Sequence, residues 1–134
     1  MTAPEISQLS VLVVDESQEM RRKLAAFLSE FSQLHVVGMA ENAATALDLF
    51  FRYRLDLVLV SICLPDRNGF DVLDCVKRAE PNCAVIIMTK QANPSVEQSG
   101  LLLGATAVCA KSGDLLEMRE AVVRLLEERS SGQQ

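Results

Sequence analysis

The sequence lacks any long apolar stretch: no run approaches the roughly 18–20 residues that a membrane-spanning helix needs. Residues 1–10 contain no basic stretch followed by an apolar core, so the pattern of a signal peptide is also missing. Basic residues are scattered apart from a triplet at 21–23, and the net charge is −5. Direct binding of nucleic acid, which needs a clustered basic face, is therefore not expected. These absences favour a cytoplasmic protein that contacts neither membrane nor nucleic acid.

Metal-binding patterns are equally scarce. The four cysteines form no Cys-x-x-Cys pair, and a single histidine, His35, offers no ligand set for zinc. In a reducing cytosol such cysteines are expected to be small buried hydrophobic residues, and His35 an ordinary surface residue. What the chain does contain is apolar residues, 49% of the total, which excludes a disordered segment and suffices for one core.

Five short apolar runs alternate with segments of helical spacing. The runs cover residues 11–15, 35–39, 57–62, 84–89 and 107–110 and are continuously apolar, as in parallel strands covered on both faces. Pro81 is expected to end the third helix, Pro94 to lie in the first turn of the fourth, and Asp114 to cap the fifth. The alternation predicts one α/β domain, a doubly wound five-stranded parallel sheet, over 1–134 with its core at about 10–128 and a polar tail at 129–134.

Polar side chains gather where the predicted strands end. Asp15 and Glu16 come at the end of the first strand, Ser61 and Thr89 at the ends of the third and fourth, and Lys111 after the fifth. Because the carboxyl ends of parallel strands form the binding edge of such a sheet, these side chains are expected to meet there. Adjacent carboxylates repel by about 4 kcal/mol at ~4 Å, so they need a cation, either Mg²⁺ or the Lys111 ammonium. In the simpler interpretation, the acids only cap a helix and Thr89 only forms strand.

The order of these residues resembles the receiver domains of bacterial response regulators. The resemblance covers roughly residues 10–128 and includes VLVVDES at 11–17, LPDRNG at 64–69, VIIMT at 85–89 and Gly104-Ala105 before Lys111. It implies a (βα)5 flavodoxin-like fold in which an acidic pair holds Mg²⁺ and an aspartate on the third strand accepts a phosphoryl group from a histidine kinase. Asp15 and Glu16 correspond to the acidic pair, and Thr89 and Lys111 to the hydroxyl and lysine that bind the phosphoryl oxygens.

The chain departs from this family pattern at four positions of one mechanism. Ser61 stands where the accepting aspartate is expected, and its hydroxyl is a far poorer nucleophile and Mg²⁺ ligand than a carboxylate. Lys90 replaces a small residue and is predicted to reach the acidic pair and block the cation site. Val108 takes the position of an aromatic that turns inward, and Ser112 that of a proline. We therefore expect no required cofactor and weak Mg²⁺ binding at most.

Two hypotheses for the function follow. The first is a pseudo-receiver, a non-enzymatic interaction module that works without phosphorylation and contacts a histidine kinase or a downstream effector. Its contact surface would be the fourth helix, fifth strand and fifth helix, through which homodimerisation is a further hypothesis. The alternative is a phosphorylation switch, modified at Ser61 itself or, less favourably, at Asp66, or a receiver with an engineered aspartate-to-serine change at position 61. The residues at Lys90, Val108 and Ser112 argue against engineering.

Overall fold

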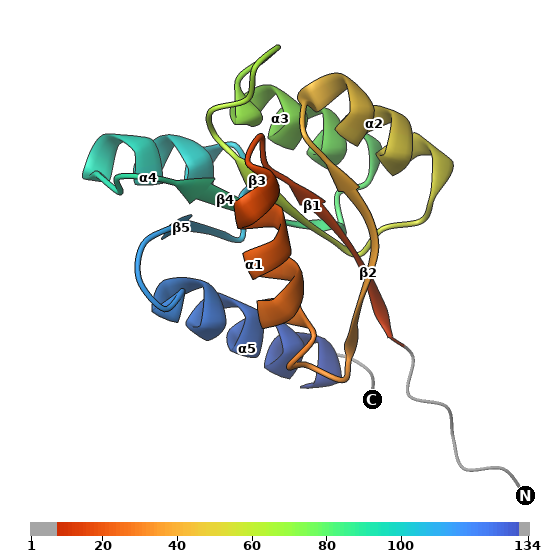
Figure 1. Cartoon of the computed structure of the whole chain (residues 1–134). Helices are drawn as coiled ribbons and strands as arrows, with labels where there is room; N and C mark the ends of the chain where they lie inside the picture. Colours follow the sequence, from red (N-terminus) through yellow and green to blue (C-terminus); the bar gives the residue numbers. More distant parts are fainter. Residues whose placement is uncertain (1–7, 132–134) are drawn as a thin grey trace, which may run out of the picture.

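Ten elements alternate along residues 8–131, the part of the chain that the computed structural model describes (Figure 1). The strands are β1 (Leu9–Val14), β2 (Leu34–Ala40), β3 (Leu57–Ser61), β4 (Ala84–Thr89) and β5 (Ala107–Ala110). The helices are α1 (Gln18–Leu28), α2 (Ala43–Arg52), α3 (Gly69–Ala79), α4 (Pro94–Leu102) and α5 (Leu116–Ser131). The predicted α/β fold with a five-stranded parallel sheet is confirmed. Helix α5 continues past the predicted start of the tail at 129, and residues 132–134 lie outside the described residues.

The strands are parallel and lie in the order β2-β1-β3-β4-β5. After β1 the chain adds β2 at one edge of the sheet, and it then adds β3, β4 and β5 in turn toward the opposite edge. The direction in which strands are added therefore reverses between β1 and β3. In open parallel sheets this reversal leaves a crevice at the carboxyl ends of the two strands. Asp15 directly follows β1 and Ser61 ends β3, so both residues border the crevice.

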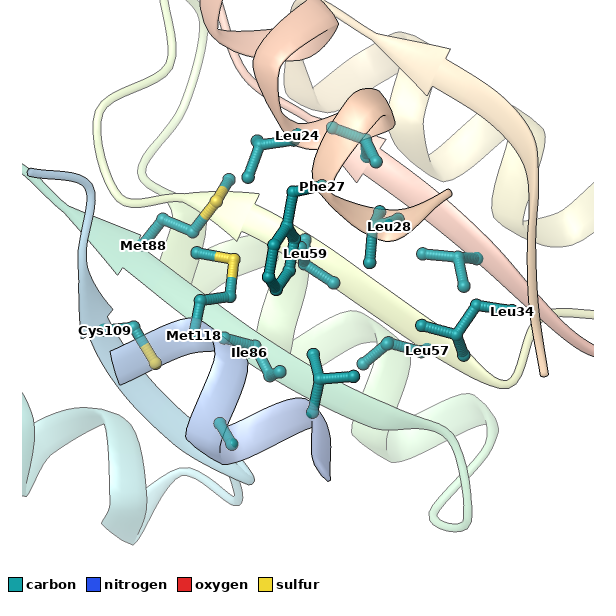
Figure 2. Close-up of a cluster of buried hydrophobic side chains, with 14 of the residues drawn as sticks. Leu24, Phe27, Leu28, Leu34, Leu57, Leu59, Ile86, Met88, Cys109 and Met118 are labelled. Atoms are coloured by element: carbon teal, nitrogen blue, oxygen red, sulfur yellow. The ribbon is translucent and has the colours of Figure 1, made fainter. Parts of the chain in front are cut away.

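Apolar side chains fill the space on both faces of the sheet. Figure 1 shows α1 and α5 on one side, and α2, α3 and α4 on the other. On the α1 and α5 side, Phe27 and Met118 pack against strand residues such as Leu59 and Ile86 (Figure 2). Burying one such side chain contributes about 1.5–3 kcal/mol. Because β1 and β3 are covered on both faces, the backbone that carries the candidate site is rigidly held.

Side chains cap the first four helices, but α5 starts differently. Ser17, Asn42, Asn68 and Asn93 each accept a backbone N–H from the helix that follows. Asp114 is not the cap of α5, contrary to the prediction, because Leu115 precedes the helix with φ of 62° and its carbonyl accepts the Arg119 N–H. A left-handed leucine costs about 1–2 kcal/mol, which burial of its side chain offsets.

The cysteines divide between core and surface. Cys83 and Cys109 are buried, and burial raises the pKa of each thiol to about 11. Cys75 is half-buried and Cys63 is exposed, so the prediction of a buried cysteine is wrong for Cys63. His35 is exposed, as expected. Within residues 8–131, none of the helices combines the length and apolar character needed to cross a membrane.

Candidate functional site

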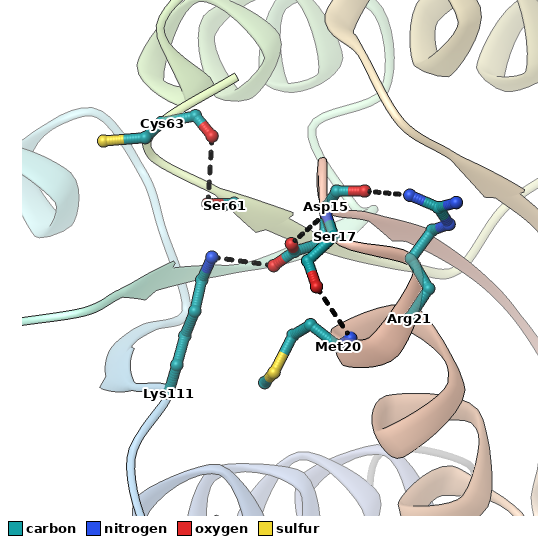
Figure 3. A network of polar contacts seen from close by, with 7 residues as sticks. All are labelled: Asp15, Ser17, Met20, Arg21, Ser61, Cys63 and Lys111. Atoms are coloured by element: carbon teal, nitrogen blue, oxygen red, sulfur yellow. Dashed lines mark hydrogen bonds and ion pairs between the residues drawn. The ribbon is translucent and has the colours of Figure 1, made fainter. Parts of the chain in front are cut away.

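The buried carboxylate of Asp15 is the centre of the candidate site. Its side chain is 1% exposed, and Nζ of Lys111, itself only 12% exposed, lies 2.7 Å from Oδ2 (Figure 3). Oδ1 accepts the backbone N–H of Ser17 at 2.9 Å, which ties the carboxylate to the start of α1. Oδ2 accepts no well-aligned hydrogen bond from a described residue, so its contact with Lys111 is an ion pair. The structure thus gives Asp15 a lysine as its counter-ion.

Ser61 ends β3 beside this ion pair and is 1% exposed. Its hydroxyl donates to the carbonyl oxygen of Cys63 at 3.3 Å, a long hydrogen bond within its own loop (Figure 3). No carboxylate or other base among residues 8–131 is hydrogen-bonded to this hydroxyl. The backbone here is fixed by Gly69, because a Cβ on that residue would lie 2.1 Å from the Ser61 carbonyl oxygen. Helix α3 therefore begins in direct contact with the end of β3.

The remaining predicted site residues, Thr89, Glu16 and Lys90, do not take part in the ion pair of Asp15 and Lys111. Thr89 donates its hydroxyl to the Gln91 carbonyl oxygen at 3.1 Å and so bonds within its own loop. Glu16 is exposed, and neither it nor Lys90 forms an ion pair within the described range. The prediction that Lys90 reaches the acidic pair is not met: Lys90 is exposed, and Lys111 is the lysine that pairs with Asp15.

Val108 lies on β5 under helix α4. It is half-buried and packs against the core on the α2 and α3 side of the sheet. A Cβ on Gly100 of α4 would lie 2.6 Å from Cγ2 of Val108. Because the helix approaches so closely, an aromatic side chain at position 108 would require α4 to move.

Asp66 has a role that the sequence did not suggest. Its two carboxylate oxygens accept the backbone N–H groups of Ala43 at 2.8 Å and Ala44 at 3.0 Å. These hydrogen bonds lower the pKa of Asp66. The loop after β3 is therefore attached to the start of α2, and both oxygens of this alternative phosphoryl acceptor are occupied. No local pattern signals the contact, since 23 residues separate Asp66 from Ala43.

The comparison with known protein families agrees with this architecture. Residues 11–123 match the response regulator receiver domain family. The chain is a receiver domain. Two similar proteins of Bacillus subtilis have nearly the same length as this receiver domain. Sporulation initiation phosphotransferase F is 31% identical over 121 residues, covering 90% of this chain and 96% of the relative. Protein CcdB is 31% identical over 116 residues, covering 87% and 96%.

Other relatives are much longer than this receiver domain. A probable cyclic di-GMP phosphodiesterase of Vibrio cholerae is 32% identical over 108 residues, and the match covers 78% of this chain but 24% of that protein. Among solved structures, the receiver domain of the putative regulator NarL from Mycobacterium tuberculosis superimposes with a TM-score of 0.81 at 25% identity, covering 90% of this chain and 98% of that one. The RcsB receiver domain of Salmonella enterica, at 18% identity and a TM-score of 0.83, shares the fold.

The residues of this receiver domain do not fit a resident Mg²⁺. That ion prefers several oxygen ligands, mainly carboxylates and water, in octahedral geometry. Here the buried carboxylate of Asp15 already has an ammonium 2.7 Å away, and Ser61 offers only a neutral hydroxyl. Within residues 8–131 there is no group of three or more potential metal ligands, counting the side chains of histidine, cysteine, aspartate and glutamate. The site is held together by an ion pair between its own side chains.

Proposed function

We propose that this receiver domain is a pseudo-receiver, a signalling interaction module that works without phosphorylation of an aspartate. The observation that carries the proposal is Ser61, a serine at the end of β3 where the family pattern has the accepting aspartate. Its hydroxyl is buried, donates to a carbonyl oxygen and has no base beside it among the described residues. A serine in that setting is a weak nucleophile.

The ion pair beside Ser61 supports the same proposal. With Lys111 on Asp15, the charge of the buried carboxylate is balanced inside the protein. A receiver that relies on phosphorylation needs its lysine for the phosphoryl oxygens and its acids for Mg²⁺. In the proposed function Lys111 and Asp15 neutralise each other's charge, so no cofactor is required and Mg²⁺ binds weakly at most.

The proposed partner is another signalling protein in the cytoplasm. Receiver domains interact with kinases and effectors, so a histidine kinase or a downstream effector is the class of partner we propose. The proposed contact surface is formed by α4, β5 and α5. Homodimerisation through this surface is the competing arrangement, and RcsB, which shares the fold at 18% identity, has been described as dimers bound to DNA.

The proposal is tested by incubating the protein with acetyl phosphate and Mg²⁺ and measuring its intact mass. We expect no phosphate adduct on the unmodified chain, and the variant Ser61→Asp, which has a carboxylate at this position, serves as the comparison. A stoichiometric adduct that hydroxylamine removes would be an acyl phosphate and would refute the proposal. A hydroxylamine-resistant adduct mapped to Ser61 would establish the alternative of serine phosphorylation. An aspartate codon for position 61 in the natural gene would identify an engineered change.

A further inference from the structure

Helix α4 leaves a group of leucines in solvent. Leu101 and Leu102 are 47% and 79% exposed, and Leu103, which follows the helix, is 43% exposed. Gly100 is the residue of α4 that is buried. Large apolar side chains that gather on a surface mark a site of interaction with another molecule. Leu101 and Leu102 both line the first of the two hollows described next. We call these two leucines, together with the two hollows, the leucine surface.

Two hollows lie on either side of one ridge of this surface. The first, about 500 Å³, runs along the whole of α4 and is lined by Pro94, Gln98 and Leu102 among others. The second, about 280 Å³, lies between α4, β5 and α5. Both hollows are also lined by Glu97 and Leu101, which therefore form the ridge between them. A partner segment could place apolar side chains in the hollows on the two sides of this ridge.

The floor of the second hollow is β5, the last strand of the sheet. Its backbone is not simply free to pair with another strand. The N–H of Ala110 donates to Oε1 of Glu117 on α5 at 3.3 Å. A partner therefore has to use side-chain contacts with the leucine surface more than backbone hydrogen bonds along β5.

The charge around the second hollow selects the chemistry of the partner. Three carboxylates, those of Glu97, Glu117 and Glu120, face one guanidinium, that of Arg124, which leaves a net charge of −2. Glu97 is also the only charged residue between positions 91 and 110, so α4 supplies no cation to the surface. Complementary charge across an interface favours the right partner and repels the wrong one.

We infer that the leucine surface docks a protein segment in which lysine or arginine residues alternate with apolar side chains. A second copy of this chain is disfavoured as the partner, because a two-fold contact brings together two patches that each carry a net charge of −2. The inference rests on the proposed function as an interaction module and names the chemistry of its partner.

The test is an NMR titration of the ¹⁵N-labelled chain with the acetylated, amidated peptide LKKLLKKL, compared with LEELLEEL. We expect the basic peptide to shift amide signals of α4, β5 and α5, and the acidic peptide to shift none. Neutralising the three carboxylates of the second hollow with Glu97→Gln, Glu117→Gln and Glu120→Gln should weaken binding of the basic peptide about tenfold at low salt. Glutamine keeps the oxygen that accepts the Ala110 N–H. Leu102→Ala, at a side chain 79% exposed, should weaken it several-fold without affecting folding.

A matched variant separates a specific site from general attraction to an acidic protein. Glu19→Gln, Glu41→Gln and Glu80→Gln change the net charge equally at exposed positions away from the leucine surface, and binding should stay within about twofold of the unmodified chain. Equal weakening by both triple variants, or shifts scattered over the whole chain, would overturn the inference. So would a dimer in sedimentation analysis that Leu102→Ala dissociates, because a second copy would then occupy the surface.

The same titration after treatment with acetyl phosphate separates this inference from the proposed function. Binding at the leucine surface only in a phosphorylated state would support the inferred partner and refute phosphorylation independence. No binding in either state, with the mass unchanged by acetyl phosphate, would refute the inferred partner and leave the proposed function standing.

Discussion

Replacing Lys111 by methionine tests how the candidate site is held together. Methionine keeps most of the volume of the lysine chain but removes the charge that lies 2.7 Å from the Asp15 carboxylate. That carboxylate is 1% exposed, so water cannot replace the ammonium. Removing one partner of a buried ion pair costs about 3–5 kcal/mol, and we expect Lys111→Met to lower the free energy of unfolding by that amount.

The converse change, Asp15→Asn, is expected to cost less, about 1–2 kcal/mol. The asparagine oxygen still accepts the Ser17 N–H, and the Lys111 ammonium, whose side chain is 12% exposed, keeps part of its hydration. At 2.7 Å and an effective dielectric of about 20, the gross attraction is about 6 kcal/mol, most of which desolvation of the two charges cancels. The double variant should therefore show a coupling of about 1–3 kcal/mol between the two positions.

Urea denaturation followed by far-UV circular dichroism measures all three variants, since the chain has no tryptophan for fluorescence. Lys23→Met is the matched control, because Lys23 donates to the Gly113 carbonyl oxygen from an exposed position and its loss should cost well under about 1 kcal/mol. If Lys111→Met costs no more than this control, or if the coupling is within about 0.3 kcal/mol of zero, the ion pair is not what holds Asp15 in place.

Three further outcomes are expected. Gly100→Ala should lower the free energy of unfolding by about 1–3 kcal/mol, since its Cβ would lie 2.6 Å from Val108, and Val108→Ala in the same chain should recover most of the loss in thermal denaturation. With an aromatic disulfide reagent at about pH 8, the exposed Cys63 should react first. The pKa values of the buried Cys83 and Cys109 rise from 9.0 to about 11, so each holds about 100-fold less thiolate than a thiol whose pKa is 9.0. Four equally fast reactions would contradict this prediction. Because hydrogen bonds lower the pKa of Asp66, its contribution to stability is present above its unfolded pKa and lost as pH falls through the folded value. Asp66→Asn should therefore be less stable than the parent at neutral pH and equal to it in strong acid, and a gap that stays constant with pH would rule the reasoning out.

The sheet could be predicted because its signal is local. Strands β4 and β5 have the predicted bounds, since each is a short, mostly apolar run that a lysine follows, Lys90 or Lys111. β1 was predicted at 11–15 but spans Leu9–Val14, because Ser10 breaks the apolar run within the strand and Asp15 is buried without belonging to it. A residue that is buried just beyond a strand and a residue that pairs within it look the same in the sequence. Only the folded structure distinguishes the two cases.

The contacts within the site depend on side-chain direction and on distant segments, which spacing does not encode. Lys90 and Lys111 both follow a strand end, yet only Lys111 turns toward Asp15. The attachment of Asp66 to α2 joins segments 23 residues apart and has no motif. Leu115 directly precedes α5 in a left-handed conformation, and its side chain is buried in the core. Helix-capping rules do not anticipate this arrangement.

The two edges of the sheet bear on how this receiver domain behaves at high concentration. On β2 the register with β1 shifts so that Val37 is an extra residue between Val36 and Gly38, which forms a bulge. On β5 the Glu117 carboxylate accepts the N–H of Ala110. A bulge and an occupied donor both make an edge a poor template for a strand of another molecule. The chain is thereby protected against the edge-to-edge stacking that leads to amyloid, while its leucines remain open to association through side chains.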